Sequence, residues 1–117
     1  MDLNSAMLKH TEWKIKLRSA ITKQETLDVI TISKDNCCDF GKWLHSDAKT
    51  KFGKLASYTD CVSKHATFHL AASKVASAIN SKKYAEAEAM LNVGSPYTTA
   101  SSAVGVAIMR LKKEAGI

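Results

Sequence analysis

Three histidines of this chain occupy positions where a helical protein normally carries aliphatic side chains. His65 and His69 are four residues apart, so on a helix their rings share one face, about 6 Å apart along the axis. His10 lies in the middle of a separate apolar stripe. Imidazole nitrogens that converge inside a helical bundle suit zinc, whereas magnesium and calcium prefer oxygen ligands. The spacing therefore predicts a zinc site built on three imidazoles.

A thiolate is expected to complete a closed tetrahedral site. The Cys37–Cys38 pair is predicted in the first turn of a helix, where free N–H groups and the helix dipole favour an anion. Gly41 follows three residues after Cys38, and its missing side chain lets a neighbouring helix come close. Cys61 leaves an alternative open, because it precedes His65 by four residues and could form a Cys-x3-His pair in place of the second histidine.

The size, cysteine content and charge of the chain limit the classes of protein to which it can belong. The 117 residues fit a single domain, residues 1–117, with a core that needs no disulfides. Three cysteines without a framework spacing indicate free thiols and a cytoplasmic setting. We expect no signal peptide, because residues 1–12 already carry polar and charged groups, and no membrane span, because no run of 18 or more apolar residues is present. The net charge of +6 comes from scattered lysines without interleaved aromatic residues, so we expect no nucleic-acid surface.

One proline and five glycines leave the interior of the chain nearly free of helix breakers. This predicts an all-α, four-helix-bundle-like domain with an additional short helix. Asp35 or Asn36 is the expected N-cap of the second helix, and Ser95 the expected cap before Pro96. Residues 23–34 follow neither the helical nor the strand period and are expected to form a connecting loop. The predicted helices cover residues 2–22, 35–47, 53–80, 84–91 and 96–114.

The helical period places all three histidines in the core. On the first and third helices the apolar residues span arcs of roughly 140°, a normal width for a packed helix face. The first stripe is Leu3, Ala6, Met7, His10, Trp13, Leu17, Ala20 and Ile21. The third is Leu55, Tyr58, Cys61, Val62, His65, Phe68, His69, Ala72, Val75, Ala76 and Ile79.

Three motifs, in this order, resemble the chemoreceptor zinc-binding (CZB) domain family. They are His10-x2-Trp13, the box Cys38-Asp39-Phe40-Gly41-Lys42-Trp43-Leu44, and His65-x2-Phe68-His69. The resemblance covers most of the chain, from Leu3 to Leu111, and implies a four-helix-bundle-like fold with a zinc site of three histidines and one cysteine. It carries over His10, Cys38, His65 and His69 as the metal ligands. Cys37, Cys61 and His45 have no counterpart in the family pattern.

Members of this family look like cytoplasmic parts of bacterial chemoreceptors or of diguanylate cyclases. The resemblance therefore implies that a chemoreceptor signalling domain, or a diguanylate cyclase domain, is the partner in the same full-length protein, and that the domain forms a homodimer. The run Trp-Lys-x-Lys-Leu-Arg at 13–18 looks more like the chemoreceptor branch. A chain of 117 residues has no room for either output domain, so we expect an excised domain or a stand-alone member.

Two signals are compatible with such a zinc site. An oxidant such as hypochlorous acid would convert the Cys38 thiolate towards sulfenate and weaken the metal site. Alternatively, loading and release of zinc would themselves change helix packing. In either case the domain is expected to be a regulatory sensor in chemotaxis-type signal transduction and not an enzyme, since four protein ligands leave no open position for water.

Two other protein classes share this size and helical character. A hemerythrin-like di-iron oxygen-binding bundle also uses His-x3-His pairs, but it needs about five histidines plus carboxylates, and the chain has four histidines. A histidine phosphotransfer module needs an exposed histidine, whereas His10, His65 and His69 are all predicted to point inward. The di-iron bundle is the main alternative.

Overall fold

Three long helices form the body of the domain in a computed structural model that describes residues 1–117. They are α1 (Leu3–Lys23), α5 (Ala56–Asn80) and α7 (Pro96–Ala115). Four short helices complete the chain: α2 (Val29–Ser33), α3 (Asp39–Leu44), α4 (Asp47–Phe52) and α6 (Tyr84–Ala89). There are no strands, so the prediction of an all-α fold is confirmed.

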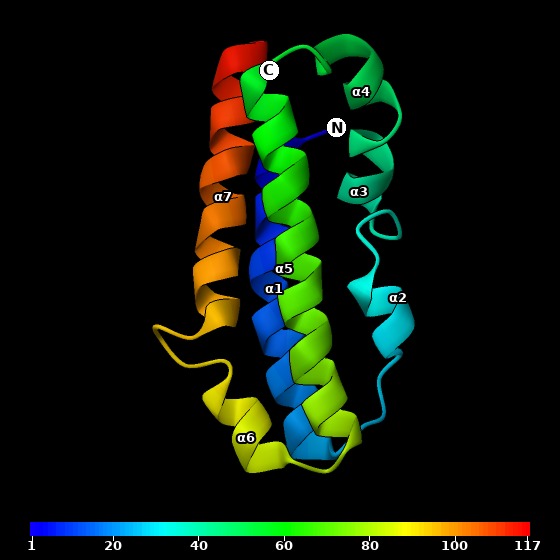
Figure 1. Cartoon of the computed structure of the whole chain (residues 1–117), viewed down its shortest axis with the longest axis vertical. Coiled ribbons are helices and arrows are strands. Elements are labelled where there is room, and N and C mark those ends of the chain that lie inside the picture. The colour runs from blue at the N-terminus through cyan, green and yellow to red at the C-terminus, as the bar shows by residue number, and fades with distance from the viewer.

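The fourth side of the bundle is a column of short helices. Figure 1 shows α2, α3 and α4 following one another along one side of α5, where a four-helix bundle would have one continuous helix. α5 is the central element and contacts α7, α2, α1, α6 and α4. α6 connects α5 to α7 at the opposite end from the two termini (Figure 1). The result is an elongated domain of 43 × 25 × 19 Å.

Local sequence signals fix the ends of the long helices. The Asp2 carboxylate accepts hydrogen bonds from Asn4 N and Ser5 N and so caps α1. Ser95 caps α7 through Thr98 N, with a proline at the first helical position. α7 ends at Gly116, whose φ of 70° is a left-handed conformation that suits glycine.

The core lies between the inward faces of α1, α5 and α7, with additions from the short helices and the segments beside them. Its largest fully buried apolar side chains include Phe68, Leu17, Leu44, Ile79, Leu91, Ile108 and Leu111. Three histidines interrupt this apolar surface: His10, His65 and His69 are all buried. The predicted core stripes of the first and third helices are largely confirmed, although Met7, Trp13 and Val62 are only half-buried at their edges.

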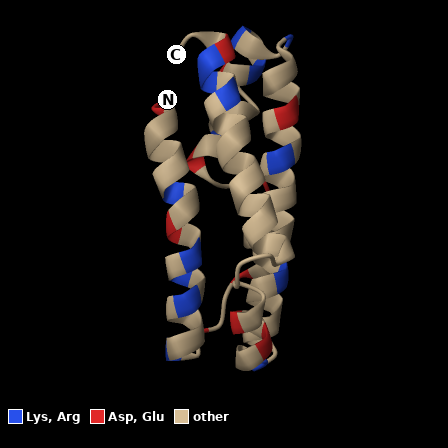
Figure 2. Ribbon diagram, turned by 90° about the vertical axis from the view of Figure 1, so that its left-hand side faces the viewer, with Lys and Arg blue, Asp and Glu red and all other residues tan.

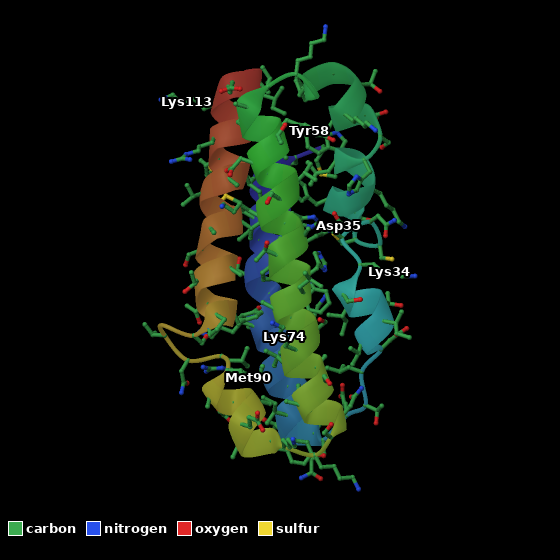
Figure 3. The ribbon with its side chains drawn as sticks, viewed as in Figure 1. Lys34, Asp35, Tyr58, Lys74, Met90 and Lys113 are labelled. Atoms are coloured by element: carbon green, nitrogen blue, oxygen red, sulfur yellow. The ribbon has the colours of Figure 1, made fainter.

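Two hydrogen-bonded connections hold the column of short helices against α5. The Asn80 side chain accepts a bond from Leu27 N at 2.8 Å and donates one to Leu27 O at 2.7 Å, which fixes the segment before α2. The Tyr58 hydroxyl donates to Leu44 O at 2.6 Å at the end of α3. In Figure 3 the side chains of this column reach towards α5 from the level of Tyr58 down to α2. The column therefore lies along most of the length of α5.

The sequence prediction was wrong in the segment between the first two long helices. Residues 23–34 are not all loop, because Asp28 caps the five-residue helix α2 and Ile32 packs into the core. Neither Asp35 nor Asn36 caps the next helix; α3 begins at Asp39, after Cys38. α4 was not predicted at all. The additional short helices number four, and their individual turns are too short to show a clear hydrophobic period.

Charged residues do not gather on one face. Figure 2 shows Lys and Arg mixed with Asp and Glu along the helices, while the middle of α7 carries neither kind. None of the helices is long and apolar enough to cross a membrane.

Candidate metal centre

The four predicted ligands meet at one point of the core. One donor atom from each of His10, Cys38, His65 and His69 lies within 4.8 Å of the other three. His10 comes from α1, Cys38 from the start of α3, and the two remaining histidines from successive turns of α5. Three separate elements therefore contribute donors to a single site, as the convergence of the stripes predicted.

The spacing of the donors matches the edges of a zinc tetrahedron. Zn–N bonds of about 2.05 Å and a Zn–S bond of about 2.3 Å place nitrogens about 3.3 Å apart and sulfur about 3.6 Å from nitrogen. Nε2 of His65 and Nε2 of His69 are 3.1 Å apart. Cys38 Sγ lies 3.4 Å from the first of these nitrogens and 3.6 Å from the second. The chain alone thus holds one triangular face of the site close to the required size.

Hydrogen bonds behind two of the rings fix which nitrogen faces the centre. Nδ1 of His69 donates to Ile32 O at 2.9 Å, and Nδ1 of His10 donates to Ala6 O at 2.7 Å. A carbonyl only accepts, so each Nδ1 carries the proton and each Nε2 keeps a free lone pair. Such bonds orient metal-binding histidines and strengthen them as ligands.

Nε2 of His10 is buried and has no hydrogen-bond partner. A buried polar atom without a partner is costly in free energy, and native structures rarely leave one. The His10 ring packs edge-on against the ring of His65, with ring centroids 5.1 Å apart. A metal ion at the centre would satisfy it, so the donor set fits zinc.

Burial keeps the three imidazoles neutral. Together with a smaller contribution from the neighbouring histidines, it lowers the pKa of His65 to about 2. It also lowers the pKa of His10 and of His69 below the ordinary value, although the bond to Ile32 O and the Asp35 carboxylate partly oppose this for His69. Neutral imidazole is the form that binds metal.

Cys38 is the N-cap of α3 and not part of its first turn. Its Sγ accepts the Gly41 N–H at 3.3 Å. The expected preference for a thiolate is outweighed by desolvation: burial raises the pKa of the thiol, and backbone N–H groups only partly lower it. A cation at the centre would favour the deprotonated sulfur, as metal coordination does.

Gly41 allows α3 to lie against the site. A Cβ at this position would come within 1.8 Å of Asp35 O and 3.1 Å of Cε1 of His65. The segment before Cys38 and the His65 ring thus both occupy the space that a side chain would need. The role predicted for this glycine is confirmed, with the addition that the closest neighbour is a backbone carbonyl.

The remaining cysteines and the fourth histidine lie outside the cluster. Cys37 is exposed, and Cys61 is buried, with its pKa raised to about 12 by burial. Neither cysteine joins the group of four donors, so the structure does not form the alternative ligand pair of Cys61 and His65. His45 is an exposed histidine that pairs with Asp35 at 2.9 Å.

Several neighbours of the site were not predicted. The carbonyls of Ala6 and Ile32 have no side-chain signature, so no sequence pattern identifies them as partners of the histidines. The rings of Phe40 and Phe68 pack edge-on against His10, with centroids 5.5 and 5.2 Å away. Both aromatic residues belong to the sequence motifs that contain Cys38 and His65, and this position was the signal that could have identified them as neighbours of the site.

Comparison with protein families agrees with this donor set. Residues 10–76 match the family described as the chemoreceptor zinc-binding domain, CZB. The chain belongs to this family. The match covers more than half of the chain and includes all four donors, although it is shorter than the expected span from Leu3 to Leu111. A CZB domain is a zinc-binding sensory domain and not a known catalytic family. Comparison with curated proteins and with solved structures gave no significant match.

We expect Gly41→Ala to abolish zinc binding although it leaves all four donors in place. The new methyl group would overlap Asp35 O and force α3, with Cys38 at its start, away from His65. The zinc content of the purified variant, measured by elemental analysis, should fall from about one per chain to well below half.

Gly105→Ala on α7 is the matched control. Its Cβ would meet only the end of the Met7 side chain at 3.9 Å, an ordinary contact. This variant should keep its zinc. Full zinc content in both variants would show that the close approach of α3 is not required.

The metal-free CZB domain should lose stability as the pH falls below about 6.5. The three buried imidazoles have folded-state pKa values below the ordinary 6.5, so below that pH the unfolded chain binds more protons than the folded one. Each contributes up to about 1.4 kcal/mol per pH unit, a contribution that for His65 extends down to a pH of about 2.

Urea unfolding in the presence of a chelator, between pH 7.5 and 5, checks this slope. The two carboxylates with lowered pKa values, Asp2 and Asp28, have ordinary values of 3.8 and contribute only at lower pH. A His65→Gln variant should show a shallower slope. A free energy of unfolding that does not change over this range would contradict the assignment of neutral buried rings.

Proposed function

We propose that His10, Cys38, His65 and His69 bind one zinc ion as a regulatory site, and that Cys38 is the ligand through which the site responds to its signal. The observation that carries the proposal is the convergence of four donors within 4.8 Å, three of them at tetrahedral spacing. Three histidines and one cysteine form a closed zinc set with no position left for a substrate. A sensory role is therefore favoured over hydrolysis.

The di-iron alternative is less compatible with this donor set. A di-iron bundle places several carboxylates between its helices. The cluster contains a thiol and three imidazoles but no carboxylate; Asp39 pairs with Lys9, and Asp35 pairs with His45. The thiol and the imidazoles together favour zinc.

Cys38 is suited to convert a chemical event into a structural one. With hypochlorous acid, the thiolate sulfur takes the oxygen atom and is oxidised to sulfenic acid, while the chlorine is reduced and leaves as chloride. Oxidation removes a zinc ligand and, at the same atom, the acceptor that caps α3 through Gly41 N–H. Release of zinc without oxidation would act on the same contacts, which keeps zinc concentration as the alternative signal.

The wider setting is also part of the proposal. The family description supports a chemoreceptor as the source of the signalling domain that reads this site. A bacterial chemoreceptor, or a related protein such as a diguanylate cyclase, is the setting that the resemblance of the sequence motifs implies. We place the domain in the cytoplasm, where free thiols such as the three cysteines of this chain persist. A change in the packing of α1, α3 and α5 would then bias the attached domain.

Single substitutions of the donors test the ligand assignment. His10→Ala, Cys38→Ser, His65→Ala and His69→Ala should each reduce zinc from about one per chain and weaken its affinity by about a hundredfold or more, because each removes a direct ligand. Cys61→Ser is the matched control: it changes a buried cysteine of α5 that lies outside the cluster, and this variant should keep its zinc. Cys38→Ser should also abolish oxidant-driven zinc release.

The signal can be distinguished with the same proteins. Zinc release by hypochlorous acid at equimolar concentration, with Cys38 oxidised in peptide mass spectra, would support oxidant sensing. An affinity near the free zinc level of the cell, without such release, would support zinc sensing. Zinc retained in every donor variant, or two irons per chain, would refute the site.

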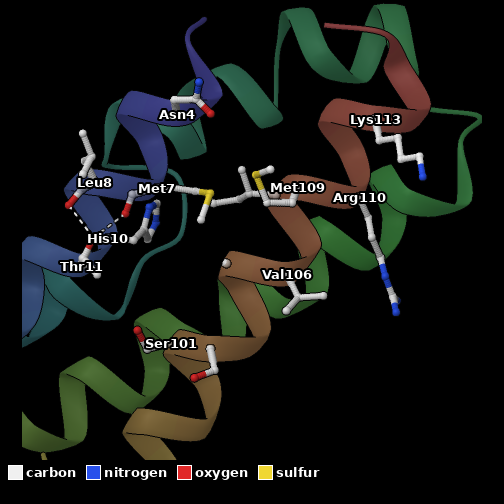
Figure 4. Close-up of a pocket in the computed structure, with 13 residues that line it drawn as sticks. Asn4, Met7, Leu8, His10, Thr11, Ser101, Val106, Met109, Arg110 and Lys113 are labelled. Atoms are coloured by element: carbon white, nitrogen blue, oxygen red, sulfur yellow. Dashed lines mark hydrogen bonds between the residues drawn. The ribbon is translucent and has the colours of Figure 1, made fainter.

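A groove between α1 and α7 supports the proposal of a homodimer. It has a volume of about 1020 Å³. Leu8, Val106 and Met109 line it and are all exposed large apolar side chains. Figure 4 shows Met7 reaching from α1 towards Met109 on α7 across the groove, with His10 behind it. Such an exposed apolar face is typical of an interaction surface, and a second copy of the chain would cover it with the same residues.

Leu8→Lys and Met109→Lys should weaken self-association by about tenfold or more, because each places a charge in the apolar face. Ile30→Lys is the matched control: this side chain is 70% exposed, but it lies on α2, away from the groove. Sedimentation equilibrium measures the dimer dissociation constant. A monomeric wild-type domain, or an equal loss in the control, would contradict the assignment of this face.

A further inference from the structure

A small cavity leads from the surface to Cys38 on the side of the site that α5 does not cover. Its volume is about 350 Å³, and it is lined by both His10 and Cys38. Cys38 is half-buried, whereas the three histidines are buried, so the sulfur is the donor with the most solvent access. Nε2 of His10, a buried nitrogen without a hydrogen-bond partner, belongs to a ring on the wall of the same cavity.

An ion pair joins the two sides of this cavity. Lys9 Nζ, on α1, lies 3.2 Å from Asp39 Oδ2, on α3. Both residues line the cavity, and each is next in the chain to a donor: Lys9 to His10, and Asp39 to Cys38. Both side chains are largely exposed, so the pair adds little to stability. Because the pair lies beside the cavity, its charges are placed to affect which reagents approach the Cys38 sulfur.

Two other charged groups line the cavity, the Asp2 carboxylate and the amino terminus. The Asp2 carboxylate accepts bonds from the Asn4 and Ser5 backbone at the start of α1. The amino terminus at Met1 also lines the cavity. Lys9 and Asp39 are therefore the side chains whose charges compensate each other next to the route to Cys38.

We propose that this cavity is the entrance through which reagents reach Cys38, and that the Lys9–Asp39 ion pair determines which charge class of reagent is admitted. While the pair is intact, the two opposite charges largely cancel at the entrance, so neither cations nor anions are attracted and uncharged reagents are favoured. The undissociated acid form of an oxidant belongs to this class, and its anion does not. The inference rests on the proposed function, to which it adds the route and the selectivity.

Removing one partner uncovers the charge of the other. Lys9→Gln leaves the Asp39 carboxylate uncompensated, which repels anions from the entrance. Asp39→Asn leaves the Lys9 ammonium uncompensated, which attracts them. The two substitutions must therefore shift selectivity in opposite directions, which a merely structural role of the pair would not produce.

Alkylation of the zinc-loaded domain by two reagents of similar shape tests this. Iodoacetamide is neutral and iodoacetate is an anion; with either, the Cys38 sulfur forms a bond to the methylene carbon and iodide leaves. A Cys37→Ser background removes the exposed neighbouring thiol. Peptide mass spectrometry gives the rate at Cys38, and the ratio of the iodoacetate rate to the iodoacetamide rate cancels differences in thiol reactivity.

We expect Lys9→Gln to lower this ratio and Asp39→Asn to raise it, each by about threefold to tenfold at low ionic strength. Both shifts should shrink at high salt, because the charges are exposed to solvent. Lys64→Gln and Asp60→Asn are matched controls, since these residues form another exposed ion pair, at 3.8 Å on α5. They should leave the ratio unchanged.

Each outcome has a separate meaning. Unchanged ratios in both Lys9→Gln and Asp39→Asn, with zinc still bound, would overturn the inference and leave the zinc site intact. Modification of Cys38 only together with the buried Cys61 would show access by unfolding and would also overturn it. Absence of zinc in the wild-type domain would instead refute the proposed function.

Discussion

Three imidazole rings and a thiol are packed into an apolar core, and this arrangement is costly without a cation. The buried nitrogens of His65 and His69 lie 3.1 Å apart, and the free nitrogen of His10 has no partner. Protonation cannot relieve the crowding, because burial holds the pKa of each ring below its ordinary value. A zinc ion accepts all of these lone pairs at once, so the binding free energy of the metal becomes part of the stability of the domain.

The same constraint explains the surroundings of the site. Backbone carbonyls of Ala6 and Ile32 hold two of the rings in the tautomer that faces the centre. Gly41 lets α3 approach until Cys38 completes the set. Because the four donors come from α1, the start of α3 and α5, the metal centre joins three elements, and loss of one ligand affects all three.

The sequence predicted what depends on side-chain type and helical period. The buried face of α5, the inward position of His10 and the four donors followed from spacing and from the family motifs. The sequence did not predict α2, α4 or the start of α3, because helices this short do not show a full hydrophobic period. The partners of His10 and His69 are backbone carbonyls, which no residue type reveals.

The column formed by α2, α3 and α4 has a further consequence. Helices of five or six residues cannot sustain themselves by their own hydrogen bonds, because nucleation costs more than one turn returns. The three long helices pack against one another directly, and the column adds four of the 24 buried apolar residues of the core, Ile32, Phe40, Leu44 and Ala48. We therefore expect local unfolding of the column to require less free energy than global unfolding, so that the metal-free domain behaves as two cooperative units of unequal stability. Zinc, bound by donors from both units, would make them open together.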